Sequence, residues 1–144
     1  LPLVDGGQQR RAFMDVSDMN EAVCRVLERP QQSNGQIFNL GNPNNELSIA
    51  ELARLLSVAF AELCPGLPAA RLESVTAEEF YGPGYDDTRE RIPDVRKAQE
   101  LLDWKPEREL AAALPAIVRD YSERYGPRIA AALAPGPFRA ARSA

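Results

Sequence analysis

The sequence predicts an α/β fold with few short strands and several amphipathic helices. Short apolar segments alternate with longer segments in which apolar residues recur at helical spacing. Only two or three strands are visible in the pattern, and a sheet that small is marginally stable by itself. We therefore expect the chain to be part of a larger α/β fold.

The first predicted unit is a strand followed by a helix. Residues 3–7 form an apolar run that ends in a Gly-Gly turn, and residues 11–16 alternate as a strand does. Asp18 is expected to cap the next helix, with Glu21 three residues later as in a capping box. Apolar residues at helical spacing continue this helix to a point near Pro30.

A second strand and helix are expected to follow. Asn34 and Gly35 predict a turn, and the apolar residues 36–40 predict a short buried strand. Ser48 and Glu51 form a second capping box. The apolar stripe from there to Leu63 predicts a helix that packs against the core.

The next segment is less regular. Residues 71–75 predict a strand and residues 77–81 a helical turn, while the Gly-Pro-Gly sequence predicts irregular structure over residues 82–92. Asp94 is expected to cap a helix, which the Trp-Lys-Pro sequence at residues 104–106 ends.

The C-terminal part predicts one more helix and a tail. Residues 110–125 carry an amphipathic pattern, with Pro115 near the start. From residue 127 to residue 144 the composition is dominated by Ala, Pro, Gly and Arg. We expect that stretch to be a frayed helix and a disordered tail.

Composition excludes several classes of function. The chain has no histidine, so a Ser-His-Asp triad and most zinc sites are excluded, and no metal site is expected. A net charge of −4 and a pI of about 5.0 do not fit a nucleic-acid-binding protein. No apolar run is long enough for a membrane span. Cys24 and Cys64 are expected to be reduced core residues, which fits a cytoplasmic location.

Three segments resemble a known family of enzymes. Residues 5–18 (DGGQQRRAFMDVSD) and 37–46 (IFNLGNPNNE) are similar to segments of extended short-chain dehydrogenases/reductases, the NAD-dependent epimerase/dehydratase family. Residues 81–94 (YGPGYDDTRERIPD) resemble a segment of UDP-glucuronate decarboxylases, a group that includes UDP-apiose/UDP-xylose synthases. The chain thus resembles the C-terminal, sugar-nucleotide-binding portion of that Rossmann-type fold, over residues 1–126.

The resemblance implies NAD as the cofactor of the parent enzyme. The family binds NAD through a Gly-rich loop and uses a catalytic Tyr-x-x-x-Lys pair, and neither sequence occurs in this chain. We expect both to lie in a Rossmann N-terminal half that precedes this chain. The 144 residues by themselves are therefore expected to be inactive, and a homo-oligomer, if one forms, is expected to use the absent half.

The resemblance assigns five residues to the substrate site. It implies that Arg11 contacts the diphosphate, that Tyr85 contacts the nucleotide sugar, and that Gly6 and Gly7 donate backbone amides. It implies that Arg91 acts at the sugar carboxylate, where a positive charge can stabilise the enolate that forms during decarboxylation. No residue is assigned to the cofactor. The neighbouring Asp86 and Asp87 are interpreted as loop charges that hold arginines in place.

Each of these residues also has a purely structural interpretation. Arg11 could pair with Asp5 or Asp15, and Arg91 with Asp86, Asp87 or Glu90. Tyr85 could be a packing residue after the Gly-Pro-Gly turn, and Gly6 and Gly7 a plain connection.

The function implied by the resemblance is oxidative decarboxylation of UDP-glucuronate to a UDP-4-keto-pentose, with UDP-xylose or UDP-apiose as further products. One alternative is half of a nucleotide-sugar 4-epimerase or dehydratase. The other is a non-catalytic module that binds a nucleotide sugar.

Overall fold

The structure is a computed structural model that describes the backbone of residues 1–133 and the side chains of residues 1–128. It has the α/β fold that the sequence predicts. The strands are β1 (Pro2–Val4), β2 (Arg10–Ala12), β3 (Glu46–Ser48), β4 (Glu73–Val75) and β5 (Glu90–Arg91). The helices are α1 (Val16–Glu28), α2 (Pro30–Ser33), α3 (Ile49–Leu63), α4 (Ala77–Tyr81), α5 (Arg96–Leu102) and α6 (Leu110–Leu133), with 3-10 turns η1 (Asp5–Gly7) and η2 (Pro43–Asn45).

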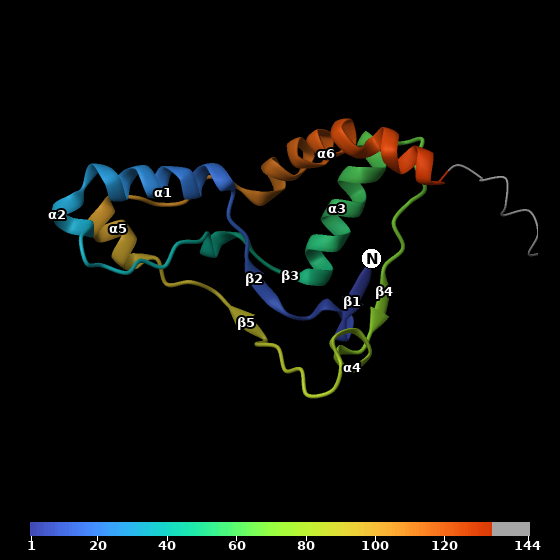
Figure 1. The fold of residues 1–144 in the computed structure, drawn as a ribbon, viewed down its shortest axis with the longest axis horizontal. Helices are drawn as coiled ribbons and strands as arrows, with labels where there is room; N and C mark the ends of the chain where they lie inside the picture. The colour runs from blue at the N-terminus through green and yellow to red at the C-terminus, as the bar shows by residue number, and fades with distance from the viewer. Residues whose placement is uncertain (134–144) are drawn as a thin grey trace, which may run out of the picture.

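The strands form two small sheets in the middle of the molecule. Strand β1 pairs with β4 in parallel, and the second sheet has the order β3-β2-β5. Strand β2 is antiparallel to β3 and parallel to β5, so segments far apart in the sequence lie side by side on either side of β2 (Figure 1).

Most helices gather at the two ends of this arrangement, while the short helix α4 lies next to β1 and β4 (Figure 1). Helices α1, α2 and α5 lie together at one end, and α3 packs against α6 at the other (Figure 1). The core at the first end consists of Ala22, Val95, Ala98, Leu102 and Trp104, all at most 5% exposed. The capping box that the sequence predicts at the start of α3 is confirmed, because the Ser48 hydroxyl accepts from the Glu51 amide and the Glu51 carboxylate accepts from the Ser48 amide.

The start of α1 differs from the sequence-based prediction. The helix begins at Val16, and Asp15 caps it by accepting a hydrogen bond from the Ser17 amide. Asp18 is not a cap: it lies inside the helix, is 1% exposed, and accepts hydrogen bonds from the backbone and side chain of Arg108. The capping pattern was misassigned because two aspartates stand three residues apart and either can start a helix.

The prediction of a strand at residues 36–40 is wrong, because the structure forms no strand there. The segment is extended but pairs with no strand of the described chain, and Ile37 is 86% exposed. Strand structure needs a partner for its backbone hydrogen bonds, and an apolar pattern by itself does not supply one. Strand β3, which the sequence did not predict, instead pairs with β2.

Two further predictions need correction. Cys64 is buried as expected, but Cys24 is exposed, because it lies on the face of α1 that points away from the core. Helix α6 passes through Pro127 and ends at Leu133, beyond the predicted end at residue 125. The expected disorder of residues 134–144 lies outside the described residues. No helix in residues 1–133 is long and apolar enough to cross a membrane.

Gly41 lies against Pro93, and this contact allows a test of how the segment that carries Arg91 is packed. A Cβ atom at this position would lie 2.4 Å from Cγ of Pro93, two residues after Arg91. The proline ring cannot rotate away, so Gly41→Ala is expected to lower the free energy of unfolding by about 2 kcal/mol, as overpacking does. Urea denaturation measures the loss, and Gly66→Ala is the control because nothing lies within 4 Å of its added methyl group. Equal stability of the two variants would contradict the predicted contact.

Candidate functional site

The centre of the candidate site is a pair of arginines on neighbouring strands. Arg11 on β2 is the register partner of Arg91 on β5. Register partners on adjacent strands point to the same face of a sheet, so the two guanidinium groups share one face. Arg10 has the opposite orientation in the strand and forms an ion pair with Glu46.

The guanidinium of Arg11 is held by the loop that precedes β5. Its Nη2 donates to both carboxylate oxygens of Asp87 at 2.8 Å, and its Nη1 donates to the carbonyl oxygens of Thr88 and Arg10 at 2.9 and 2.8 Å. The Arg11 and Asp87 side chains are 18% and 25% exposed. This ion pair, in which one guanidinium nitrogen donates to both carboxylate oxygens, therefore fastens the loop to β2.

Arg91 differs from Arg11 in its surroundings. The residue is exposed, and within the described part of the chain its side chain forms no ion pair or hydrogen bond. The structural alternative for Arg91, a salt bridge to Asp86, Asp87 or Glu90, is thus not formed. The guanidinium of Arg91 is therefore a positive charge without an ion-pair partner among the described residues, on the strand next to the Arg11–Asp87 pair.

Tyr85 lies in the same loop and stacks on Tyr81. The ring centroids are 4.0 Å apart with an interplanar angle of 27°. Gly82 and Gly84 have φ angles of 93° and 82°, which turn the loop back and bring the two rings together. Partial burial raises the pKa of the Tyr85 phenol above its ordinary value, and the carboxylate of Asp87 raises the pKa further.

Gly6 and Gly7 lie in the turn η1 between β1 and β2. Gly7 is buried, and a Cβ atom there would lie 2.9 Å from the backbone nitrogen of Ala50 in α3. With a φ angle of 66°, this position requires glycine for packing as well as for backbone conformation. Asp5 in the same turn accepts a hydrogen bond from the amide of Ala77, which joins η1 to the start of α4.

The structure thus brings together three of the five predicted site residues: Arg11, Tyr85 and Arg91. Gly6 and Gly7 lie apart from these three residues, in the turn η1 that packs on α3 and bonds to the start of α4. The interpretation of Asp87 as a charge that holds an arginine agrees with its contact to Arg11. Sequence reasoning missed Tyr81, although two tyrosines four residues apart around a Gly-Pro-Gly turn were a usable signal.

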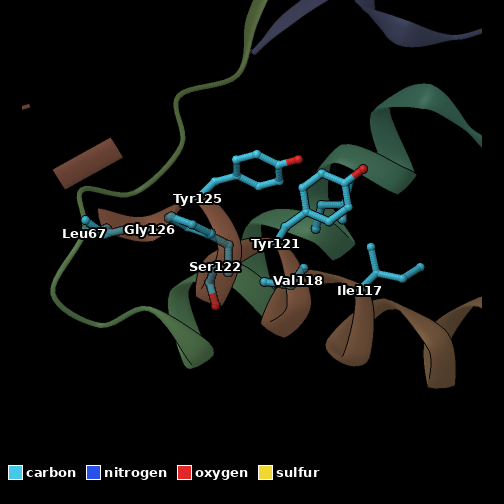
Figure 2. A pocket seen from close by; sticks show the side chains of 9 residues that line it. Leu67, Ile117, Val118, Tyr121, Ser122, Tyr125 and Gly126 are labelled. Carbon is cyan, nitrogen blue, oxygen red and sulfur yellow. The ribbon is translucent and has the colours of Figure 1, made fainter. Parts of the chain in front are cut away.

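A hollow at the other end of the molecule is chemically different. An apolar groove of about 550 Å³ runs between α3 and α6, lined mainly by Leu56, Phe60, Leu67, Ile117, Tyr121 and Tyr125. Figure 2 shows the rings of Tyr121 and Tyr125 next to each other at this groove, with centroids 5.5 Å apart. The lining contains no arginine or lysine, so the groove does not suit a phosphate-bearing ligand.

The described residues bear on two further kinds of site, a metal-ligand cluster and a Gly-rich cofactor loop. No group of three or more potential metal ligands occurs among residues 1–133. The Gly6–Gly7 turn does not have the form of a cofactor loop, because it is a 3-10 turn between two strands and Gly7 packs directly on Ala50. The Gly6–Gly7 turn therefore does not fit the phosphates of NAD, and no residue between 1 and 133 is assigned to the cofactor.

Comparison with known proteins identifies the family. Residues 1–41 match the model of the NAD dependent epimerase/dehydratase family. UDP-D-apiose/UDP-D-xylose synthase 1 of Arabidopsis thaliana is 39% identical over 128 residues, which cover 85% of this chain and 33% of that protein. This chain belongs to the NAD-dependent epimerase/dehydratase family. It spans about a third of the length of the curated relatives that it matches.

Solved structures share this fold. The PbgP3 protein from Burkholderia pseudomallei has a TM-score of 0.65 and 30% identity, and the match covers 92% of this chain and 36% of that one. MoeE5, solved in complex with UDP-glucose and NAD, has a TM-score of 0.57 and 25% identity, with coverage of 86% and 36%. The fold of this chain is thus part of a Rossmann-type fold.

Proposed function

We propose that this chain is the substrate-binding portion of an NAD-dependent enzyme that oxidatively decarboxylates UDP-glucuronate to a UDP-4-keto-pentose. UDP-xylose and UDP-apiose are possible further products of the whole protein. The main support is the register of Arg11 with Arg91, which places two guanidinium groups on one face of a sheet. A UDP-uronic acid carries both a diphosphate and a carboxylate, and these are the two anions that arginine recognises best.

Each site residue has a defined task in this proposal. Arg11 binds the diphosphate, and backbone amides of Gly6 and Gly7 add donors to the nucleotide. Tyr85 contacts the nucleotide sugar from the loop above β5. Arg91 binds the sugar carboxylate, because it is exposed and unpaired within the described residues.

Arg91 also has a task in the chemical step. When the C–C bond to the carboxylate breaks, CO2 leaves and the bonding electrons stay on the sugar as an enolate, conjugated with the 4-ketone. A guanidinium beside that negative charge lowers the energy of the transition state. A guanidinium stays protonated in proteins, so the proposal gives Arg91 the role of a fixed positive charge rather than that of a proton donor. In this proposal NAD is the cofactor of the whole protein and is bound by residues outside this chain. The proposed location of the whole protein is the cytoplasm.

The nearest alternative is a 4-epimerase or dehydratase acting on a neutral nucleotide sugar. Such an enzyme needs cations for the diphosphate but none for the sugar. The affinity difference between UDP-glucuronate and UDP-glucose separates this alternative from the decarboxylase. The second alternative is a non-catalytic module that binds a nucleotide sugar.

The test is a calorimetric titration of the chain with UDP-glucuronate, UDP-glucose and UMP. UDP-glucuronate is expected to bind about tenfold more tightly than UDP-glucose, because one charge-assisted hydrogen bond to the carboxylate contributes on the order of 1.5 kcal/mol. UMP is expected to bind most weakly, since it lacks the second phosphate and the sugar. Equal affinity for the two UDP-sugars would exclude a carboxylate site and favour the epimerase or dehydratase.

A further inference from the structure

We propose that Asp87 is a specificity-determining residue of the substrate site, because it occupies the guanidinium of Arg11 until a diphosphate displaces it. The proposal rests on the proposed function in one respect, namely that Arg11 is the diphosphate ligand. It adds that this arginine is reserved by an internal carboxylate, so that a ligand must compete for it.

The hydrogen-bond geometry makes the two states mutually exclusive. A guanidinium has five N–H donors. Both terminal nitrogens of Arg11 are engaged, Nη2 with the two oxygens of Asp87 and Nη1 with the carbonyls of Thr88 and Arg10. Only the Nε–H group is left, so Arg11 cannot form a bidentate contact with a ligand while Asp87 holds it.

The surroundings allow Asp87 to leave. Its side chain is 25% exposed, so the carboxylate reaches water when it moves. The loop that carries it has two glycines at positive φ, Gly82 and Gly84, and these positions adopt other conformations at low cost. Movement of Asp87 also moves the Thr88 carbonyl and Tyr85, so displacement by the ligand rearranges the whole loop over β2 and β5.

The competition favours a diphosphate over other anions. A carboxylate offers Arg11 no more charge and no more acceptors than Asp87 already provides, whereas a diphosphate brings more of both. The expected result is a site that binds nucleotide diphosphates and rejects free sugar acids.

The experiment measures the affinity of UDP for the unaltered chain and for Asp87→Asn by calorimetry. Asp87→Asn removes the competing charge and is expected to tighten UDP binding by about fivefold. This change in affinity corresponds to the free energy that a partly exposed ion pair contributes. The matched control is Asp86→Asn, which changes net charge equally at an exposed side chain with no hydrogen bond or ion pair among the described residues. In an Arg11→Ala background, Asp87→Asn is expected to have no effect on UDP binding.

A second measurement addresses specificity. Free glucuronate is expected to compete with UDP for the Asp87→Asn variant but not for the unaltered chain. The absence of competition in the variant would overturn the role of Asp87 in selectivity, even if UDP bound more tightly. Circular dichroism of each variant verifies that the fold is retained.

The other outcomes are equally decisive. Weaker UDP binding in Asp87→Asn, an equal gain in Asp86→Asn, or no UDP binding by any variant would overturn the competition. If the unaltered chain prefers UDP-glucuronate but Asp87→Asn has no selective effect, only this inference fails. If Asp87→Asn tightens UDP binding but no variant distinguishes UDP-glucuronate from UDP-glucose, the inference holds and the proposed decarboxylase function fails.

Discussion

The Arg91→Ala variant is expected to lose about tenfold in affinity for UDP-glucuronate while binding UDP-glucose as tightly as the unaltered chain does. The loss corresponds to one charge-assisted hydrogen bond. UDP-glucose has no carboxylate, so it loses no such bond. Arg91 is exposed and forms no ion pair within the described residues, so its removal leaves no partner buried and unpaired. Calorimetric titration with both ligands measures the two changes.

Arg89→Ala is the matched control for this prediction. Arg89 lies two residues before Arg91 and is also exposed. Its backbone carbonyl accepts a hydrogen bond from the amide of Arg10, and this bond does not involve the Arg89 side chain. The variant therefore changes net charge equally without altering the proposed carboxylate contact. Equal losses for UDP-glucuronate in Arg89→Ala and Arg91→Ala would show general electrostatic attraction rather than a specific site.

The Asp18→Ala variant is expected to lower the free energy of unfolding by about 3 kcal/mol, the largest stability effect that the structure predicts. The carboxylate is 1% exposed and accepts from the Arg108 amide at 3.1 Å and from the Arg108 guanidinium at 2.7 Å. Removal takes this acceptor from both Arg108 donors, although the half-exposed guanidinium also lies 4.0 Å from Asp15. It also opens a cavity next to Trp104, whose indole N–H donates to the Asp18 carbonyl. Urea denaturation followed by Trp104 fluorescence measures the change.

Two control variants separate the causes. Asp18→Asn keeps the shape and one acceptor, so it is expected to cost about half as much as alanine. Asp120→Ala removes an exposed partner of Arg124 on α6 and is expected to cost less than about 0.5 kcal/mol. A similar loss in Asp18→Ala and Asp120→Ala would mean that Asp18 is not the buried anchor between α1 and the segment before α6.

Local patterns predicted the elements that depend on neighbouring residues. The Ser48–Glu51 capping box and the apolar stripe behind it define α3 from Ile49 to Leu63, because both act within one helix. The helical turn at Ala77–Tyr81 was also predicted from its local sequence. The same reasoning failed for Asp18, because its partner, Arg108, is distant in the sequence and helical patterns carry no information about it.

The sequence by itself determined the class of fold, most of the helices and the identity of the residues that carry charge at the site. Motif resemblance added the roles expected of Arg11, Tyr85 and Arg91. Only the tertiary structure decided that Arg11 and Arg91 are register partners and that Asp87, rather than Asp5 or Asp15, holds Arg11. The physical reason is that strand register and ion pairing join segments far apart in the chain, and several pairings satisfy the same local pattern until the whole chain folds.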